Sequence, residues 1–138
     1  MTGKLEPTNS PYAMAKIAAI EMGSALKNQY GHEIINLMPT NLYGPKDNFD
    51  LESSHVIPGL LTKFHKAIIE EKDSIEIWGS GKPKREFLYV DDLASAIEFL
   101  LDKEWKYDLL NIGSGKEITI KELALLIKKI TNYEGEIK

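Results

Sequence analysis

Apolar residues recur at two different spacings along the 138-residue chain, and each spacing predicts one kind of element. Helical spacing predicts helices over about 11–29, 56–71, 91–102 and 119–131. Continuous or alternating apolar runs predict strands over about 33–39, 74–78, 85–90, 107–112 and 117–119, with a further strand beginning within 132–138. Strands that alternate with helices indicate an α/β fold with at least some parallel strand pairing.

The first predicted helix has clear ends but no single apolar face. Asn9 and Ser10 are favourable N-cap residues, and Pro11 suits the first helical position. Gly31 then provides a stop after Gln29. Because apolar side chains lie nearly all round this helix, we expect it to be buried on more than one side, between a sheet and another helix or subunit.

Polar and small residues separate the other elements. The segment TNLYGPKDNFDLESS at 40–54 is rich in Asn, Asp, Gly and Pro, and predicts a turn-rich loop. Asp91 or Asp92 is expected to cap the helix that follows the strand at 85–90. Thr119, with Glu122 three residues later, has the spacing of a capping box.

Composition excludes several classes of function. The net charge of −4 and the lack of a basic run argue against a surface for nucleic acid or for an anionic membrane. With no cysteine the chain has no disulfide, no thiolate zinc site and no cysteine nucleophile, which fits a reducing cytoplasm. We predict no metal site. The sequence shows no signal peptide and no apolar run of the ~18 residues that a membrane span needs.

Tyr12 and Lys16 form the first pattern with a chemical meaning. They are four residues apart on the first predicted helix, so they lie one above the other on the same face. An ammonium close to a phenol favours the phenolate and lets a tyrosine donate a proton near neutral pH. An interfacial tyrosine above a solvated lysine has the same spacing by chance, and the pair alone does not decide between the two interpretations.

Further stretches follow this pair in a fixed order. They are PYAMAK at 11–16, MPTNLYGP at 38–45, SHVIPGLL at 54–61, WGSGKPKREFLYVDDLASA at 78–96 and NIGSG at 111–115. The series resembles the extended short-chain dehydrogenase/reductase family of nucleotide-sugar epimerases and dehydratases, over essentially the whole chain. The resemblance implies an α/β fold: the C-terminal part of a Rossmann-type, doubly wound and largely parallel domain plus a small substrate-binding lobe. It also implies a nucleotide-sugar 3,5-epimerase/4-reductase that uses NADPH and GDP-4-keto-6-deoxy-mannose.

The resemblance implies roles for individual residues. Tyr12 would protonate the substrate oxygen as hydride arrives, and Lys16 would assist it and hold the nicotinamide ribose. His55 matches the general acid of epimerisation, although a lone histidine at a helix start is more often structural. The implied cofactor-binding residues are Lys16, Pro39, Thr40, Asn41, Leu42 and His55, and the implied substrate-binding residues are Lys63, Trp78 and Arg85.

One of these positions departs from the family pattern. Lys63 stands where the family commonly carries an arginine on the helix after the histidine. Lysine keeps the positive charge but loses the planar fork that binds a diphosphate at two points. We therefore expect a weaker diphosphate contact here.

The glycine-rich unit with which members of this family begin has no counterpart in the sequence. GSGKP at 79–83 and GSGKE at 113–117 are turns beside strands and lack the G-x-G-x-x-G spacing that holds a dinucleotide pyrophosphate. We expect the C-terminal part of such an enzyme. Residues 1–45 would end the dinucleotide-binding domain and 46–138 would form mainly the nucleotide-sugar lobe, with about 90–113 returning to the Rossmann sheet.

The family's usual dimer implies a homodimer through the helix from Pro11 to Gln29. Two alternatives stay open for the function. The chain belongs to another sugar-nucleotide epimerase or dehydratase of the same family, or it is a catalytically inactive fragment that keeps only the fold of the substrate lobe. Assays on candidate sugar nucleotides would distinguish the 3,5-epimerase/4-reductase from the first alternative. A cofactor titration would distinguish it from the second.

Overall fold

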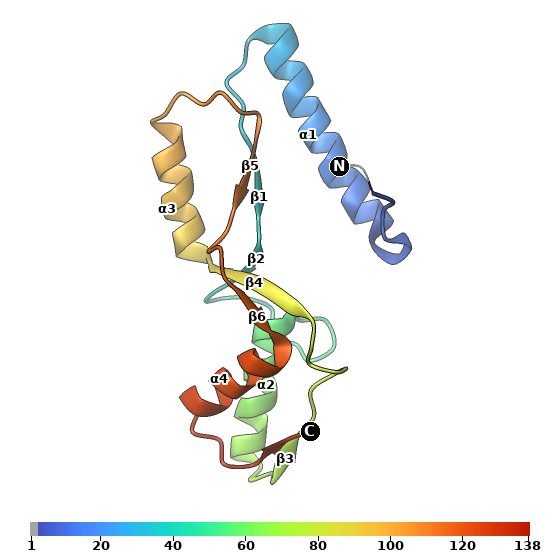
Figure 1. The fold of residues 1–138 in the computed structure, drawn as a ribbon, viewed down its shortest axis with the longest axis vertical. Coiled ribbons are helices and arrows are strands. Elements are labelled where there is room, and N and C mark those ends of the chain that lie inside the picture. Colours follow the sequence, from blue (N-terminus) through green and yellow to red (C-terminus); the bar gives the residue numbers. More distant parts are fainter. Residues whose placement is uncertain (1–2) are drawn as a thin grey trace.

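The computed structural model describes residues 3–138 as an elongated α/β molecule (Figure 1). Its elements are η1 (Pro7–Asn9), α1 (Ser10–Tyr30), β1 (Asn36–Pro39), β2 (Asn41–Tyr43), α2 (Val56–Ile69), β3 (Ser74–Ile75), β4 (Lys84–Tyr89), α3 (Val90–Leu101), β5 (Leu109–Ile112), β6 (Glu117–Thr119), α4 (Ile120–Ile130) and β7 (Glu136–Ile137). We call α1, β1, α3 and β5 the sheet region, and α2, β3, α4 and β7 the lobe. Strands β2, β4 and β6 form a middle sheet between them (Figure 1). No helix within 3–138 has the length and apolar character needed to cross a bilayer.

Helix α1 has the length and the stop that the sequence predicts. Pro11 stands in its first turn, and Gly31 ends it with a φ of 70°, a left-handed conformation that favours glycine. Asn9 is the N-cap residue, but its side chain makes no capping hydrogen bond in the described structure. Instead its backbone N–H donates to the Glu6 carboxylate at 3.1 Å, in the 3-10 turn that leads into the helix.

The C-terminal half of α1 lies closer to β1 and β5 than its N-terminal half does (Figure 1). Gly23 is buried there, and a Cβ at this position would lie 3.1 Å from Asn36 Oδ1. Lys27 forms an ion pair with Asp108, next to the start of β5. The N-terminal half, which carries Tyr12, leans away from the strands (Figure 1).

Parallel pairing dominates, as predicted. β1 pairs with β5, β2 with β4 and β3 with β7, all in parallel, whereas β6 runs antiparallel to β4. The chain passes from β1 to β2 through Thr40, and from β5 to β6 through 113–116. The two parallel strands β1 and β5 therefore lead into the middle sheet at two adjacent points.

Three local predictions were wrong. The predicted loop at 40–54 contains β2, whose three residues gain backbone partners on β4, far away in the sequence. The strand predicted at 74–78 is shorter in the structure and consists only of the two residues of β3, because its partner β7 is also two residues long. Asp91 and Asp92 do not cap α3: its N-cap is Tyr89, and the two carboxylates lie in the first turn, where negative charge interacts favourably with the helix dipole.

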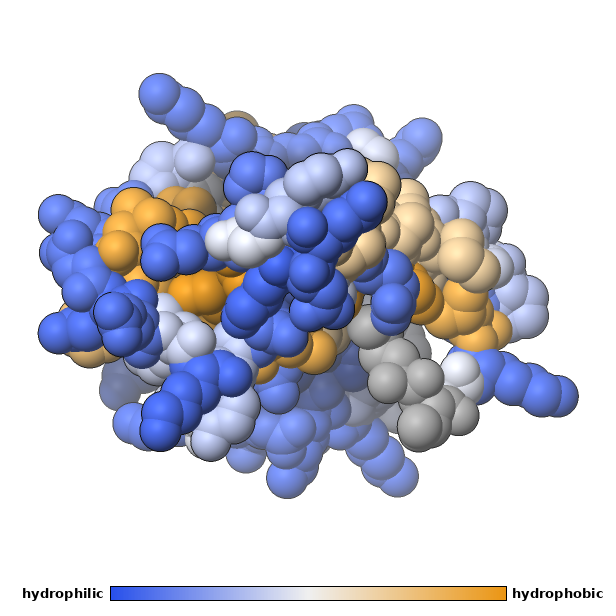
Figure 2. Space-filling view, turned by 90° about the horizontal axis from the view of Figure 1, so that it is seen from above, coloured by the Kyte–Doolittle hydropathy of each residue, from blue (hydrophilic) through white to orange (hydrophobic). Residues whose placement is uncertain are grey.

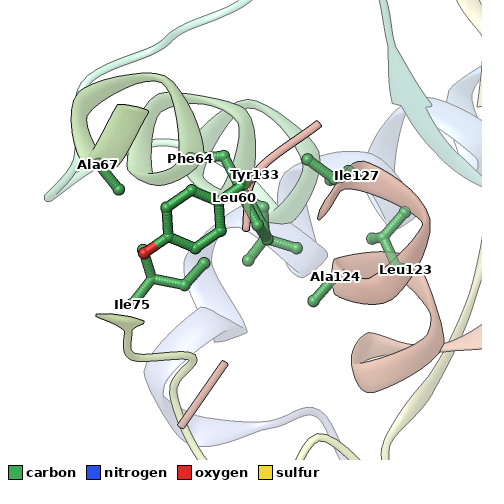
Figure 3. Close-up of a cluster of buried hydrophobic side chains, with 8 residues drawn as sticks. All are labelled: Leu60, Phe64, Ala67, Ile75, Leu123, Ala124, Ile127 and Tyr133. Atoms are coloured by element: carbon green, nitrogen blue, oxygen red, sulfur yellow. The ribbon is translucent and has the colours of Figure 1, made fainter. Parts of the chain in front are cut away.

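The hydrophobic core lies in the lobe (Figure 3). The rings of Phe64 and Tyr133 meet edge to face with centroids 5.5 Å apart, and the Tyr133 hydroxyl donates to the Lys72 carbonyl at 2.7 Å. The predicted capping box of Thr119 and Glu122 is confirmed at the start of α4. The core residues are Leu60, Phe64, Ala67, Ile75, Leu123, Ala124, Ile127 and Tyr133.

Apolar side chains of the sheet region are exposed instead. Seen from above, hydrophobic surface lies on both sides of the molecule, where Figure 1 has α3 on the left and α1 on the right (Figure 2). The exposed apolar residues of these helices are Tyr12, Met14, Met22, Leu26 and Tyr30 on α1, and Val90, Ile97, Phe99 and Leu101 on α3. The predicted burial of the first helix on several sides is therefore not seen within this one chain.

Candidate functional site

Tyr12 and Lys16 lie together on the first turns of α1. Lys16 Nζ is 5.4 Å from the centroid of the Tyr12 ring, so the predicted placement on one helix face is confirmed. The Tyr12 side chain is 61% exposed, and a ligand can reach the phenol from solvent. The ammonium thus lies over the face of the Tyr12 ring, as in a cation–π contact.

Residues 39–42 lie where the chain crosses from β1 to β2. Thr40 N donates to the Ile112 carbonyl at 3.0 Å, and Asn41 Nδ2 donates to the Glu86 carbonyl at 2.9 Å. The Thr40 hydroxyl oxygen is buried and has no hydrogen-bond partner among the described residues, which is uncommon because such an atom costs free energy. The segment follows the carboxyl ends of the parallel pair β1–β5, the edge at which α/β sheets bind ligands.

His55 is the N-cap residue of α2, and its exposed side chain makes no capping hydrogen bond in residues 3–138. Its carbonyl accepts a hydrogen bond from Gly59 N at 2.9 Å. In the loop before it, the Asp50 carboxylate accepts hydrogen bonds from the hydroxyl and the backbone N–H of Ser53. These bonds hold the pKa of Asp50 below its ordinary value. Hydrogen bonds thus fix the backbone around His55, whereas its imidazole is exposed to solvent.

Lys63 and Trp78 come together on the lobe, although they are far apart in the sequence. Lys63 Nζ donates to the Glu76 carbonyl at 3.0 Å and lies 4.5 Å from the centroid of the Trp78 ring. The Trp78 side chain is 76% exposed, so its indole is open to a ligand. Arg85 is not part of this group: its Nη1 donates to the Lys84 carbonyl at 2.8 Å.

The candidate residues therefore form three groups, which are Tyr12 with Lys16, residues 39–42, and Lys63 with Trp78, whereas His55 and Arg85 stand apart. No side-chain hydrogen bond within 3–138 joins one group to another. The same range contains no cluster of three or more His, Asp and Glu side chains that could hold a metal ion.

Sequence reasoning missed Glu86. Its carboxylate accepts a hydrogen bond from Gly115 N at 2.6 Å, and the Ser114 hydroxyl lies 3.4 Å from the same oxygen. In the sequence, a charged residue within an alternating strand suggests a solvent-facing position. The available signal was the Gly-Ser-Gly turn at 113–115, because successive backbone N–H groups in such turns attract an anionic acceptor.

Tyr43 and Tyr89 stand at the paired ends of β2 and β4, with ring centroids 5.5 Å apart. The negative charge of Asp91 raises the pKa of the Tyr89 phenol above its ordinary value, and partial burial adds to the shift. Tyr89 is therefore a poor source of protons at neutral pH.

The fold and the order of the motifs define the class of this protein. Residues 1–113 match the NAD dependent epimerase/dehydratase family, and the chain belongs to this family. The family resemblance drawn from the motifs is confirmed.

Relatives within the family share most of this sequence. GDP-L-fucose synthase 1 of Arabidopsis thaliana is 51% identical over 137 residues, and GDP-L-fucose synthase of Escherichia coli strain K12 is 45% identical over 146 residues. Each match covers 99% of this chain, whereas the chain spans only 42% and 46% of the length of these relatives, in their C-terminal part.

A solved structure supports the same assignment. The GDP-L-fucose synthetase from Naegleria fowleri, bound to NADP, matches with a TM-score of 0.84 and 31% sequence identity, over 98% of this chain and 44% of that one. The expected α/β fold, part of a Rossmann-type architecture, is thereby confirmed.

Proposed function

We propose that residues 1–138 are part of an NADP-dependent nucleotide-sugar 3,5-epimerase/4-reductase that makes GDP-L-fucose from GDP-4-keto-6-deoxy-mannose. The observation that carries this proposal is the exposed Tyr12 phenol with the Lys16 ammonium 5.4 Å from its ring. The identity of 45–51% to GDP-L-fucose synthases, over 99% of the chain, supports the choice of substrate.

Tyr12 donates its phenolic proton to the keto oxygen of the sugar during reduction. NADPH, when bound, supplies the hydride for this step. Lys16 binds the ribose beside the nicotinamide and assists Tyr12 with a positive charge 5.4 Å from the centroid of its ring. Solvent then returns the proton to the exposed phenol for the next turnover.

Residues 39–42 fit the nicotinamide end of NADP. The Thr40 hydroxyl, buried without a partner among the described residues, offers a donor and an acceptor to a polar ligand group. We include Pro39, Asn41, Leu42 and His55 in the same cofactor-facing set. Because the sequence holds no G-x-G-x-x-G unit, we assign no pyrophosphate contact to residues 1–138.

His55 returns a proton to the sugar during epimerisation. A base of the complete enzyme, which we do not assign within residues 1–138, takes a proton from a carbon next to the keto group and leaves an enolate. Delivery of the His55 proton to the opposite face then inverts that carbon. An imidazole exchanges protons near neutral pH, and His55 presents one to solvent at the start of α2.

The nucleotide part of the substrate binds on the lobe and at the start of β4. Trp78 offers a flat face to the base or the sugar. The Arg85 guanidinium binds two diphosphate oxygens after it leaves the Lys84 carbonyl. Lys63 adds a positive charge beside Trp78.

We assign residues 1–45 to the dinucleotide-binding domain and 46–138 mainly to the nucleotide-sugar lobe, with about 90–113 back in the Rossmann sheet. The pairing of β1 with β5 supports this return. The exposed apolar residues of α1 support a homodimer through this helix, because a large bare apolar surface favours association. The lack of cysteine supports a cytoplasmic location.

A fusion protein tests the proposal. Residues 1–138 replace the matched C-terminal part of the E. coli GDP-L-fucose synthase, which supplies the rest of the enzyme. With GDP-4-keto-6-deoxy-mannose and NADPH, we expect NADPH oxidation and a product that co-elutes with GDP-L-fucose. Residues 1–138 alone are the control and are expected to show no turnover.

Two outcomes would redirect the proposal. A GDP-sugar product of another configuration would favour a different epimerase or reductase of the family. A folded fusion that binds NADPH but turns over none of a panel of keto sugar nucleotides would favour a lobe without catalytic function.

A further inference from the structure

Glu86 contacts both places where a strand of the sheet region, β1 or β5, leads into the middle sheet. Its backbone carbonyl accepts a hydrogen bond from Asn41 Nδ2 at 2.9 Å, next to the β1–β2 crossing. Its carboxylate accepts one from Gly115 N at 2.6 Å, in the β5–β6 turn, where the Ser114 hydroxyl is 3.4 Å away. A single residue thus ties two crossings that the sequence separates by about seventy positions.

Gly113 allows the β5–β6 turn to approach so closely. A Cβ at this position would lie 2.8 Å from Glu86 Cδ, closer still to its carboxylate oxygen, and 2.8 Å from Thr40 Cγ2. The φ of Gly113 is not positive, so the position requires glycine for space alone. Gly115 differs, because its φ of 71° favours glycine for conformation.

Thr40 is half-buried and packs against this arrangement. Its N–H donates to the Ile112 carbonyl at 3.0 Å, its methyl group faces Gly113, and the next residue, Asn41, is bound to the Glu86 carbonyl. Its hydroxyl oxygen is the buried side-chain atom that lacks a partner among residues 3–138. The Glu86 carboxylate holds the turn against which Thr40 packs and, through the turn, holds Thr40 itself.

We propose that Glu86 is a positioning residue for the cofactor. Its carboxylate binds the turn at 113–115, and this turn fixes Thr40. Residues 39–42, where the nicotinamide end of NADP binds, are thereby held in place. This inference rests on the proposed function. Glu86 acts through Thr40 and touches neither the sugar nor the reacting atoms. Its loss therefore weakens cofactor binding while the nucleotide-sugar contacts of the lobe stay in place.

The first test measures the hydrogen bond between Gly115 N and the Glu86 carboxylate in the 138-residue chain, without any assay of activity. Loss of a charge-assisted hydrogen bond in Glu86→Ala is expected to speed amide exchange at Gly115 by about tenfold or more, as followed by NMR. The amide of Lys82, bound to the Ser80 hydroxyl in another turn, serves as the internal reference. Glu117→Ala is the matched control, because Glu117 pairs with Glu86 across β4 and β6 and makes no side-chain hydrogen bond within 3–138. An unchanged exchange rate at the Gly115 amide would show that the Glu86 carboxylate does not hold the turn at 113–115.

The second test separates positioning from general destabilisation in the fusion protein. Glu86→Ala is expected to raise the Kd and the KM for NADPH by about tenfold, with the KM for the sugar nucleotide changed less than about twofold. Glu86→Gln keeps an acceptor oxygen and is expected to restore most of the NADPH affinity. Equal changes in both KM values, or no change in either, would refute a positioning role.

Gly113→Ala provides an independent variant. Its methyl group displaces the Glu86 carboxylate and also meets the Thr40 methyl group, so we expect it to weaken NADPH binding at least as much as Glu86→Ala does, with less than additive effects in the double variant. Fully additive effects would mean that the two residues act separately. If the wild-type fusion binds NADPH without turnover, the proposed reaction fails, whereas the Kd and the amide exchange still decide the role of Glu86.

Discussion

Phe64 in the lobe has 0% of its surface exposed, whereas Phe99 on α3 leaves 58% exposed. The contrast extends to whole elements: α2 and α4 enclose a common core, and in the described structure α3 has no buried residue and α1 has only Gly23. The lobe thus encloses its own apolar surface, and the sheet region presents much of its apolar surface to solvent.

The proposed chemistry is divided in the same way. The proposed proton donor Tyr12 stands on the open sheet region, and the proposed nucleotide-sugar contacts Lys63 and Trp78 stand on the closed lobe. A self-contained lobe holds its ligand groups without help, because its own core fixes the helices that carry them. An open region needs a second surface to complete a site. We therefore expect substitutions in the core of the lobe to act on folding, and substitutions of exposed residues of the sheet region to act on turnover or association.

The largest expected effect is a difference in the free energy of unfolding between a substitution in the lobe and one in the sheet region. Phe64→Ala leaves a cavity in the lobe core and should lower the free energy of unfolding by about 3–5 kcal/mol. Phe99→Ala removes the same ring from an exposed place and should cost less than about 1 kcal/mol. Urea denaturation followed by circular dichroism measures both. Similar losses for the two variants would show that α3 is covered in solution.

The next expected effect is on turnover. Tyr12→Phe in the fusion protein should lower kcat by about 100-fold or more, equivalent to ~2.7 kcal/mol, because the ring remains but the proton is lost. The Kd for NADPH should stay within about twofold of wild type, since Lys16 is retained. Tyr30→Phe, on the same helix and similarly exposed, is the control. A variant that keeps more than about a tenth of the wild-type rate would mean that Tyr12 is not the acid.

His55→Gln tests the proton transfer assigned to the start of α2. The amide can form hydrogen bonds but cannot exchange protons near neutral pH, so epimerisation should slow by about tenfold or more. Deuterium uptake from D2O at the carbons beside the keto group reports the deprotonation steps. His65→Gln, exposed on the same helix, should have no effect. Release of deuterated product at the wild-type rate would exclude His55 as the reprotonating acid.

Local signals in the sequence predicted much of this fold. Thr119 and Glu122 predicted the capping box of α4, and Gly31 predicted the end of α1. Both could be predicted because helix caps depend on residues only a few positions apart. The pairing of Lys16 with Tyr12 follows from helical spacing alone.

Features that depend on distant partners escaped prediction. β2 is three residues long and forms because β4, more than forty positions away, supplies its hydrogen-bond partners. The contact of Lys63 with Trp78, and that of Glu86 with Gly115, also join residues that no local spacing connects. The sequence named Lys63 and Trp78 through family resemblance, and it gave no reason to select Glu86.

A smaller effect concerns association through α1. Met14 and Met22 are 54% and 64% exposed, and their burial in a homodimer would stabilise it. Each Met→Gln change should raise the dimer dissociation constant by about tenfold, as measured by sedimentation equilibrium. Leu101→Gln, on the equally bare α3, is the control and should leave the constant unchanged. A wild-type chain that is monomeric at high concentration would contradict the proposed dimer.

The smallest expected effect is a pH dependence confined to the lobe. Hydrogen bonds from the hydroxyl and the backbone N–H of Thr119, at 2.7 and 2.9 Å, hold the pKa of Glu122 below its ordinary value of 4.5. The positive charge of Lys84 adds to this shift.

Because the folded state lowers this pKa, the stabilisation from the Glu122 carboxylate is complete above the unfolded value and is lost as the pH falls through the folded value. Glu122→Gln removes the titrating group, so its deficit in the free energy of unfolding should be largest at neutral pH and should shrink in acid. Urea midpoints measured at pH 7 and at about pH 3 give the two deficits. Glu98→Gln on α3 is the control, since Glu98 makes no side-chain hydrogen bond among residues 3–138, and its deficit should not follow this pattern. A deficit for Glu122→Gln that stays constant with pH would show that the capping box holds α4 by shape and not by the charge of its carboxylate.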